Sequence, residues 1–285
     1  MKLIHTIHEL RAELEACRLA GKTIGLVPTM GALHEGHASL VKRATEENDV
    51  TVVSIFVNPT QFNDPADLEK YPRTLAEDSR LLEELQADYA FAPSVAEVYP
   101  EPDTRVFHFP PLDEVMEGPR RPGHFNGVAQ IVSKLFYFVQ PDRAYFGEKD
   151  FQQLAIIHRL VEQLELPIQI VGCPICREPD GLALSSRNKL LTPEQRTQAL
   201  AISKTLFDSR DYMHQGHTLA ETTDFVCRRI AEAPGLELEY FAVVDGDTLQ
   251  SVSTWEESPY VVGCITVHCG AVRLIDNLKY KTKEA

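Results

Sequence analysis

The feature that most constrains the fold is a regular alternation of apolar, β-branched runs with segments of helical period over the first 175 residues. Runs typical of strands lie at residues 23–27, 50–57, 89–92, 143–146 and 168–171, and helical periods lie at residues 37–47, 74–86, 125–139 and 151–164. Strands that are apolar throughout and separated by helices are typical of a parallel sheet covered on both faces. We therefore predict an α/β domain built on a Rossmann-like, doubly wound parallel sheet.

Local signals refine this prediction at three places. Thr74 and Glu77 have the spacing of a capping box, and Asp150 stands where it would cap the following helix. The proline-rich stretch of residues 93–122 has little periodicity, apart from a strand-like run at residues 104–109. A loop of that length inside a compact domain is usually functional, and we expect it to form a wall of the site.

The pattern changes after residue 176. Two helices are predicted, each opened by a capping box, Thr192 with Gln195 and Thr218 with Glu221, and strand-like runs follow at residues 236–245, 260–268 and 271–276. This order predicts a smaller α+β domain. We place the boundary between residues 175 and 176, just before the turn-forming sequence EPDG.

Charge and composition exclude several classes of function. A formal net charge of −14 argues against long nucleic acid as a partner, although a local pocket can still hold a small phosphorylated ligand. The sequence shows no apolar run long enough to cross a membrane and no export signal, so we expect no membrane partner and a cytoplasmic location. We interpret the six cysteines as reduced thiols, and Cys173-x-x-Cys176 as a weak signal for metal.

The stretch VPTMGALHEGH follows the first predicted strand and resembles none of the common cofactor motifs. Gly31 and Gly36 have the separation of a phosphate-binding P-loop, but His37 stands in place of the lysine. No G-x-G-x-x-G follows the strand, as a dinucleotide site requires. His34 and His37 are also one residue too close for the H-E-x-x-H zinc motif. We therefore predict no protein-held metal.

Two histidines three residues apart share one face of a helix. At the N-terminus of that helix the dipole and the main-chain amides favour anions, and imidazole can donate a hydrogen bond to a phosphate oxygen. His34 and His37 are thus candidates to hold a polyphosphate. The alternative is that they only cap the helix.

A set of ordered motifs decides between these interpretations. The chain contains PTMGALHEGHASLV, FVNPTQF, YPRT, RPGHFNGV, FGEKDFQQL and LSSRN in this order. In this respect it resembles the pantoate-β-alanine ligase family, within the nucleotidyl-transferase superfamily that includes class I aminoacyl-tRNA synthetases. The resemblance runs from about residue 20 to residue 190 and continues more weakly to the C-terminus.

The resemblance implies that pantoate and ATP form a pantoyl adenylate with release of pyrophosphate, and that β-alanine then attacks it to give pantothenate and AMP. It implies that residues 1–175 bind ATP and pantoate and that residues 176–285 act as a lid. His37, His34 and Lys149 would be catalytic. The ATP-binding residues carried over from the motifs are Met30, Gly31, Ala32, Leu33, His34, Glu35, Gly36, His37, Gly147, Glu148, Lys149, Asp150, Cys176, Leu184, Ser185, Ser186 and Arg187.

The resemblance also assigns the acid substrates. Gln61 and Gln153 would hold pantoate, and Gln61 would lie near β-alanine, since neutral amides can both donate to and accept from hydroxyls. Three residues are weaker candidates. Asn58 would be a neighbour of Gln61, and Arg121 would supply a second positive charge. Asp78 would be a carboxylate near the metal-bound phosphates. Mg²⁺ would arrive with ATP, and the family suggests a homodimer.

Two positions depart from the family pattern. Leu184 stands where methionine is usual, and Cys176 stands where valine is common. Leucine nearly conserves the volume of methionine, so we expect activity to be kept. Two rival functions are a cytidylyl- or adenylyltransferase acting on a phosphorylated small molecule, for which an arginine-rich pocket would be expected, and a non-catalytic nucleotide-sensing module.

Overall fold

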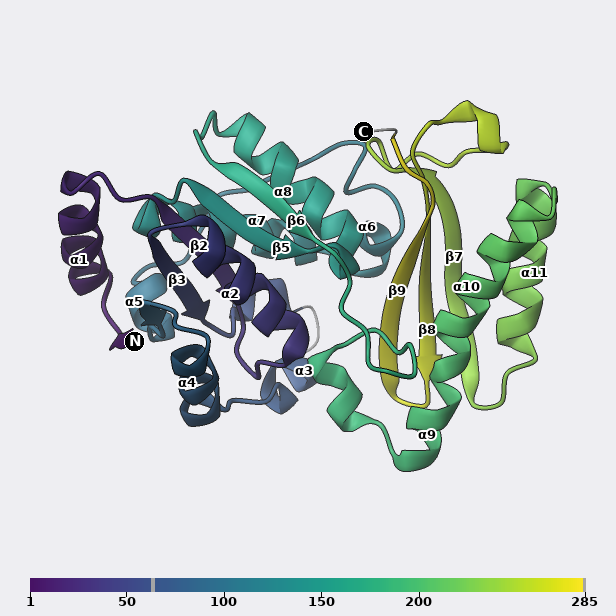
Figure 1. Ribbon diagram of the computed structural model, residues 1–285, viewed down its shortest axis with the longest axis horizontal. Coiled ribbons are helices and arrows are strands. Elements are labelled where there is room, and N and C mark those ends of the chain that lie inside the picture. The colour runs from purple at the N-terminus through teal and green to yellow at the C-terminus, as the bar shows by residue number, and fades with distance from the viewer. Residues whose placement is uncertain (63–64, 284–285) are drawn as a thin grey trace. The chain divides into compact units, whose positions relative to one another are not determined.

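The computed structural model describes residues 1–62 and 65–283, and its internal contacts divide the chain into two compact units (Figure 1). The first unit consists of Met1–Asp113, Glu117–Glu148 and Gln153–Pro174. The second consists of Glu114–Met116, Lys149–Gln152 and Ile175–Ala285. The short segment Lys149–Gln152 thus belongs to the second unit although the chain on both sides of it belongs to the first.

Within the described residues, the first unit is built on a six-stranded sheet with the strand order β1-β4-β3-β2-β5-β6, in which every neighbouring pair is parallel. Its strands are β1 (Lys2–Ile4), β2 (Ile24–Thr29), β3 (Val50–Ile55), β4 (Tyr89–Phe91), β5 (Arg143–Gly147) and β6 (Gln169–Cys173). Its helices are α1 (Ile7–Leu19), α2 (Glu35–Glu47), η1 (Pro59–Gln61), α3 (Pro65–Lys70), α4 (Leu75–Glu84), α5 (Val95–Val98), α6 (Glu117–Arg120), α7 (His124–Val139) and α8 (Phe151–Gln163), of which α8 begins in the segment held by the second unit.

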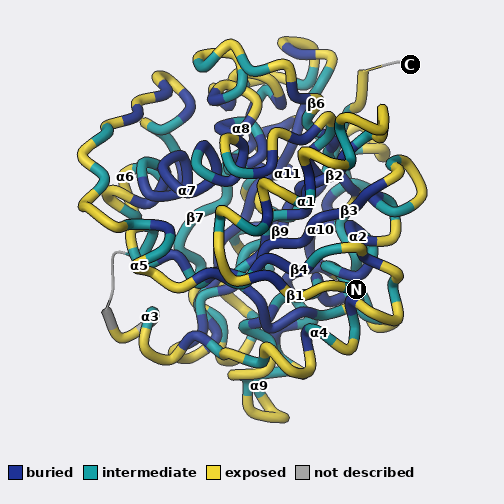
Figure 2. Tube along the Cα trace, turned by 90° about the vertical axis from the view of Figure 1, so that its left-hand side faces the viewer, coloured by how far each residue is buried: buried dark blue, intermediate teal, exposed yellow. Residues whose placement is uncertain are grey.

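Helices cover both faces of this sheet. Neighbouring residues of one strand point to opposite faces, and on β4 Ala90 packs in a core with Leu40 and Val41 of α2, whereas the ring of Phe91 meets Phe138 of α7 edge-on. Helix α7 is largely buried, as its dark blue trace in Figure 2 shows. The predicted doubly wound α/β sheet is therefore confirmed.

The strand order reverses between β2 and β5. Strand β2 pairs with β3 on one side and with β5 on the other. The chain after β2 continues to β3 on one side, and the chain after β5 continues to β6 on the other side, so the two segments lead away from each other. In open parallel sheets, ligands bind outside the carboxyl ends of the strands at this point. The chain segments at these ends begin at Met30 and Glu148, with the segment after β3 beginning at Phe56.

Two local predictions for this unit are wrong, and one short strand was missed. Thr74 does not form a capping box with Glu77: its side chain makes no capping hydrogen bond, and its hydroxyl instead donates to the carboxylate of Asp78 at 3.2 Å. Residues 104–109 form no strand, since side chains bond their main chain: Asn126 accepts from Phe107 N, and Gln130 donates to the carbonyl of Arg105. The three-residue strand β1 was not predicted.

The second unit contains, in its described part, an antiparallel three-stranded sheet of β7 (Leu236–Asp245), β8 (Val261–Cys269) and β9 (Val272–Lys281). Helices α10 (Leu200–His214) and α11 (Leu219–Ala231) pack against it (Figure 1). The remaining elements are η2 (Glu148–Asp150), η3 (Ser186–Leu190), α9 (Pro193–Gln198) and η4 (Trp255–Glu257). Both predicted capping boxes are present, at Thr192 and Thr218, which confirms these two helix starts.

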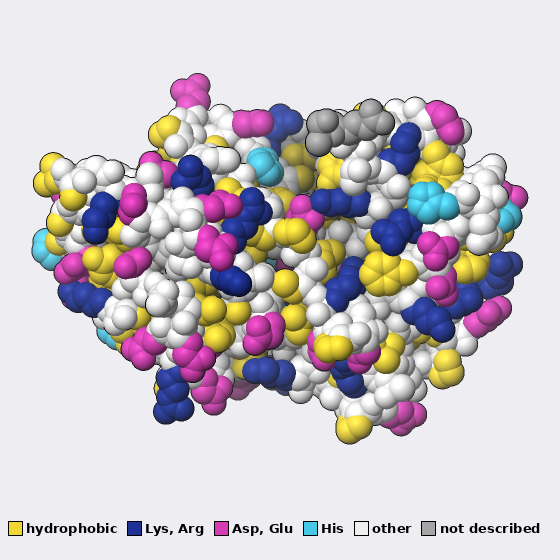
Figure 3. Space-filling model, viewed as in Figure 1, with side chains coloured by type: hydrophobic (Ala, Val, Ile, Leu, Met, Phe, Trp, Pro, Cys, Tyr) yellow, Lys and Arg dark blue, Asp and Glu magenta, His cyan; other side chains and the backbone are white. Residues whose placement is uncertain are grey.

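The face of the molecule in Figure 3 carries acidic and basic side chains interspersed with one another. None of the helices in residues 1–62 and 65–283 combines the length and the apolar character that crossing a membrane requires.

Candidate active site

The loop that follows β2 brings the two histidines together. His34 is the N-cap residue of α2, and the carbonyl of His34 accepts the first helical hydrogen bond from Ala38 N at 3.0 Å. The ring centroids of His34 and His37 lie 4.1 Å apart, with the planes tilted by 39°. Both imidazoles therefore stand at the N-terminus of a helix, where the dipole favours a bound anion.

The hydrogen bonds of His34 define its tautomer. Its Nδ1 accepts a hydrogen bond from the main-chain N–H of Gly36 at 3.1 Å, so this nitrogen carries no proton. In a neutral imidazole the proton is then on Nε2, which becomes a donor. Capping the helix thus leaves Nε2 as the donor of the same side chain.

The main chain between β2 and α2 is held from two sides. Gly31 N donates to the hydroxyl of Thr29 at 3.1 Å, and this hydroxyl donates to the carbonyl of Ser54 on β3 at 2.6 Å. The amides of Ala32 and Leu33 donate to the buried carboxylate of Asp78. The sequence suggested a place near metal-bound phosphates for Asp78, whereas the structure shows its two oxygens bonded to this loop.

Gln61, in the short helix after β3, lies beside the loop that follows β2. Its amide nitrogen contacts the sulfur of Met30 at 3.1 Å, and its side-chain oxygen accepts from Asn58 Nδ2 at 3.2 Å. Met30, a candidate for ATP, is thus in contact with Gln61, a candidate for pantoate. The two residues follow neighbouring strands of the sheet. Asn58 is buried and is the neighbour of Gln61 that the sequence suggested.

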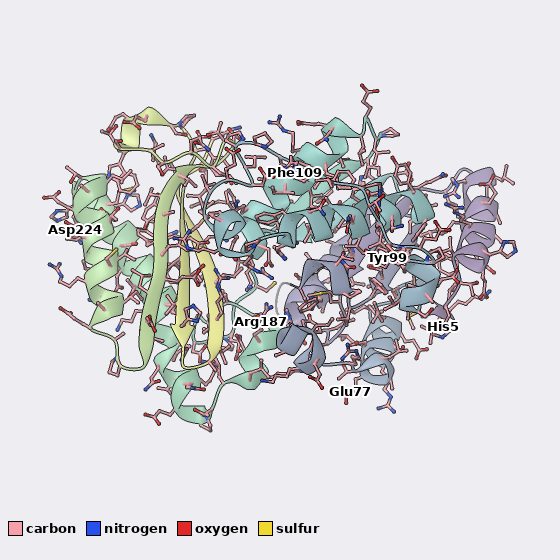
Figure 4. The ribbon with its side chains drawn as sticks, turned by 180° about the vertical axis from the view of Figure 1, so that it is seen from behind. His5, Glu77, Tyr99, Phe109, Arg187 and Asp224 are labelled. Atoms are coloured by element: carbon pink, nitrogen blue, oxygen red, sulfur yellow. The ribbon has the colours of Figure 1, made fainter. Side chains whose placement is uncertain are left out.

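Tyr99 fixes Asn58 from the other side and was not predicted from the sequence. Its hydroxyl donates to Asn58 Oδ1 at 2.8 Å (Figure 4 labels Tyr99). Burial raises the pKa of Tyr99, so the hydroxyl keeps its proton and remains a donor. Asn58 in turn donates to the carbonyl of Gly127 on α7 at 3.1 Å. The amide of Gln61 is therefore oriented by a chain of hydrogen bonds.

His124, at the start of α7, holds the main chain of Gln61. Its Nδ1 is 2.9 Å from the carbonyl oxygen of Gln61 and must donate to it, so Nε2 is the acceptor that faces Arg121 Nη1 at 3.1 Å. Arg121 also lies 3.8 Å from the carboxylate of Glu117. The suggested positive charge of Arg121 thus lies next to a residue that contacts Gln61. His124 belongs to the motif RPGHFNGV, which was the only sequence signal for it.

The candidates at the end of β5 lie close together along the chain. Gly147 is the last residue of β5, Glu148 begins η2, and Gln153 lies in the first turn of α8 with its side chain half-buried. Asp150 is exposed and ends η2, which runs directly into α8.

The second unit gathers the remaining ATP candidates. Ser185 is the N-cap of η3 and accepts from Arg187 N at 3.3 Å, and Leu184 N donates to the carbonyl of Cys176 at 3.0 Å. The carbonyl of Lys149 accepts from Asn277 on β9 at 3.0 Å. Lys149, Asp150, Cys176 and residues 184–187 are therefore carried by one unit, and Arg187 is labelled in Figure 4. The approach of this group to the two histidines stays a prediction.

An ion pair between a half-buried arginine and a buried aspartate links two segments of the second unit. Arg177 makes two bonds to the carboxylate of Asp276, at 2.7 and 2.8 Å, and also donates to the carbonyls of Gly181 and Asn277. Such bidentate pairing fixes geometry as well as charge. It joins the turn before Leu184 to the strand that holds Lys149.

The cysteines and acidic residues offer no separate metal centre in the part of the chain that the structure describes. All six cysteines are free, and Cys173, the last residue of β6, is buried. Among the described residues, no group of three or more histidine, cysteine, aspartate and glutamate side chains is arranged to hold a metal ion.

A doubly wound parallel sheet is present, and two imidazoles stand at a helix N-terminus after the carboxyl end of β2. This combination is typical of nucleotide-binding α/β proteins. The family model of pantoate-beta-alanine ligase matches residues 2–279, so the chain belongs to that family.

Individual relatives agree with this assignment. The chain is 68% identical over 281 residues to the pantothenate synthetase of Bacteroides thetaiotaomicron, covering 99% of both sequences. The pantothenate synthetase structure from Thermus thermophilus matches with a TM-score of 0.93 at 44% identity, covering 99% of this chain and 100% of that one. The pantoate-beta-alanine ligase of Francisella tularensis, complexed with beta-gamma ATP and beta-alanine, matches with a TM-score of 0.82 at 36% identity, covering 99% and 98%.

Proposed function

We propose that this protein condenses pantoate with β-alanine in a reaction driven by ATP. The carboxylate of pantoate attacks the α-phosphorus of ATP, and pyrophosphate leaves. The amine of β-alanine then attacks the acyl carbon of the pantoyl adenylate, and AMP leaves with formation of the amide bond of pantothenate. Membership in the pantoate-β-alanine ligase family favours this reaction over nucleotidyl transfer to a phosphorylated small molecule.

The chemistry requires stabilisation of negative charge on the phosphoryl oxygens and on the leaving pyrophosphate. His34 donates from Nε2, because its Nδ1 is occupied by the helix cap, and His37 stands beside it as the second donor. Lys149, Ser185, Ser186 and Arg187 would hold the β- and γ-phosphates. The other ATP contacts would come from the remaining residues of 30–37, from Gly147, Glu148 and Asp150, and from Cys176 and Leu184.

The observation that carries the proposal is the contact between Gln61 and Met30. It places a neutral, oriented amide beside the loop that ends in the two imidazoles. A carboxylic acid with hydroxyl groups needs donors and acceptors of this kind, whereas a phosphorylated acceptor needs cations. Gln61 and Gln153 would bind pantoate, and Gln61 would also meet β-alanine.

Mg²⁺ would be bound mainly by the phosphate oxygens of ATP and by water, and would neutralise part of their charge. The expected site of action is the cytoplasm. The expected assembly is a homodimer, which sedimentation equilibrium of the purified protein tests directly.

Exchange of labelled pyrophosphate into ATP tests the first half-reaction. We expect exchange that requires pantoate and does not require β-alanine, since the adenylate forms before the amine reacts. His37→Ala should lower the rate by on the order of a hundredfold or more. The same substitution at His8, an exposed histidine of α1, is the matched control and should leave the rate unchanged.

Two outcomes would contradict the proposal. One is exchange driven equally well by an amino acid or by a phosphorylated alcohol in place of pantoate. The other is an exchange rate in His37→Ala equal to that of His8→Ala.

A further inference from the structure

The carboxylate of Asp78 is buried and bonded to three neutral donors. Its side chain is in the first turn of α4, and the residue is 3% exposed. Oδ1 accepts from Leu33 N at 2.8 Å and from the hydroxyl of Thr74 at 3.2 Å, and Oδ2 accepts from Ala32 N at 3.0 Å. Hydrogen bonds to a charged oxygen are about twice as strong as those between neutral groups. Asp78 therefore has a strong hold on two successive amides of the loop after β2.

This loop needs to be held, because its main chain is in an unfavourable conformation. Gly31 has φ of +81° and Ala32 has φ of +51°. The left-handed region is unfavourable for an L-residue such as alanine. A Cβ atom at Gly31 would lie 3.0 Å from Asp78 Oδ2 and 3.0 Å from Ile55 Cγ2, so the carboxylate is in close contact with the strained segment.

Three main-chain amides of this loop donate hydrogen bonds to side chains of the protein. Those of Ala32 and Leu33 bind Asp78, and that of Gly31 binds the hydroxyl of Thr29. In glycine-rich phosphate loops, main-chain amides of this kind bind the ligand's phosphate groups. Here a carboxylate of the protein takes that position, and in the proposed function the imidazoles of His34 and His37 contact the nucleotide.

We infer that Asp78 is a positioning residue for the nucleotide loop, defined as residues 30–34. It keeps Ala32 left-handed and thereby places His34 as the cap of α2, with His37 beside it. It contacts neither ATP nor a metal ion. The inference rests on the proposed function only in assigning ATP as the ligand of the two histidines.

Asp78→Asn is the direct test. The asparagine has the same shape, but its NH₂ group faces a main-chain N–H, so one amide loses its acceptor. We expect KM for ATP to rise by about tenfold, which corresponds to the loss of one such hydrogen bond. KM for pantoate should stay within about twofold, since Gln61 is held by other residues. Glu77→Gln, the neighbouring exposed carboxylate labelled in Figure 4, is the matched control and should change neither value.

Rescue by glycine separates positioning from direct binding. Glycine adopts positive φ without strain, so Ala32→Gly in the Asp78→Asn background should recover at least about threefold of the lost ATP affinity. If Asp78 acted on phosphate or metal directly, the added glycine would recover nothing. Unchanged KM for ATP in Asp78→Asn, or no recovery in the double variant, would overturn the inference.

A measurement on the unaltered protein covers the case in which Asp78→Asn fails to fold. The amides of Ala32 and Leu33 should exchange slowly with solvent without any substrate, and ATP should not slow them further. Fast exchange that becomes slow on addition of ATP would mean that phosphate binds these amides, against the inference. Pantoate-dependent pyrophosphate exchange reports the proposed function separately, so the two can fail independently.

Discussion

At the residue scale, His34 uses its two ring nitrogens for different purposes. Nδ1 accepts from Gly36 N and caps α2, while Nε2 is directed to donate. The two interpretations of the sequence, helix cap and phosphate ligand, are therefore compatible in one side chain. The structure shows the cap, and the phosphate contact is part of the proposed function.

Substitutions at His34 separate the two roles. Asparagine keeps an acceptor for the cap but has no Nε2–H, whereas alanine has neither. We expect His34→Ala to lower the free energy of unfolding by about 1 kcal/mol and His34→Asn to leave it nearly unchanged. Both should slow pyrophosphate exchange by on the order of tenfold or more. Urea unfolding and the exchange rate give the two readouts, and normal exchange in His34→Asn would mean that only the cap matters.

The family resemblance made Gln61 and Asn58 candidates, and both stand in the motif FVNPTQF directly after a strand. It did not identify the groups that orient them. Tyr99 lies 41 residues from Asn58 in the chain, and His124 lies 63 residues from Gln61. Each pair comes into contact only when the domain folds. Separations of this kind leave no local pattern in the sequence.

At the element scale, α7 approaches η1 closely at Gly127. A Cβ atom there would be 2.2 Å from the carbonyl oxygen of Thr60 and 2.6 Å from Gln61 Cα. Main-chain atoms cannot move aside as a flexible side chain can. The glycine therefore sets the distance between the helix and the turn that carries Gln61.

Gly127→Ala should be harmful although alanine is the better helix former by about 1 kcal/mol. We expect the turn to be displaced, with a rise of about tenfold in KM for pantoate and a smaller change for ATP. Tyr137→Phe, on the exposed side of the same helix, should change neither constant. Steady-state kinetics with each substrate varied checks this, and a Gly127→Ala enzyme with normal KM for pantoate would contradict it.

The proline-rich stretch is attached to α7 by a buried charged group. Asp103 accepts from Arg105 at 2.6 Å, with Lys134 at 3.6 Å, and the side chain of Gln130 donates to the carbonyls of both Asp103 and Arg105. Hydrogen bonds from Arg105, above all, lower the pKa of Asp103 to about 2.

This lowered pKa predicts an acid-sensitive contribution to stability. A carboxylate with a pKa lowered by folding stabilises the native state fully above its unfolded pKa of about 4. That contribution, roughly 2 kcal/mol, is lost as the pH falls from about 4 to about 2. Urea unfolding between pH 5 and pH 2 should show this loss in the wild type and much less of it in Asp103→Asn. Equal pH dependence in the two proteins would contradict the assignment.

The elements that could be predicted are those with strong periodicity, and the errors have physical causes. Residues 104–109 alternate like a strand, but their main chain is bonded by the side chains of Asn126 and Gln130. Thr74 has the spacing of a capping box, but the carboxylate of Asp78 takes its hydroxyl. In the first case tertiary partners displaced the local pattern, and in the second a competing residue four positions along the same helix did so.

At the scale of the whole molecule, the candidate residues are divided between the two units. The histidines, Gln61 and Gln153 belong to the first, and Lys149 and residues 184–187 belong to the second. The second group is internally braced, because Asn277 holds Lys149 and the neighbouring Asp276 holds Arg177. The sequence predicted a division into two domains, and the role of the second as a lid stays a prediction.

If the second unit closes over ATP, the segment of residues 179–188 should become protected, because Ser185 to Arg187 would bind phosphates held by the first unit. We expect its amides to exchange several-fold more slowly with a non-hydrolysable ATP analogue. Helix α10, in the same unit, is the internal control, since it packs in that unit's own core and should not change. Lys149→Ala should weaken the protection, because the lysine would bind the same phosphates as Ser185 to Arg187. Exchange over residues 179–188 that is unaffected by the analogue would mean that the second unit does not close as a lid.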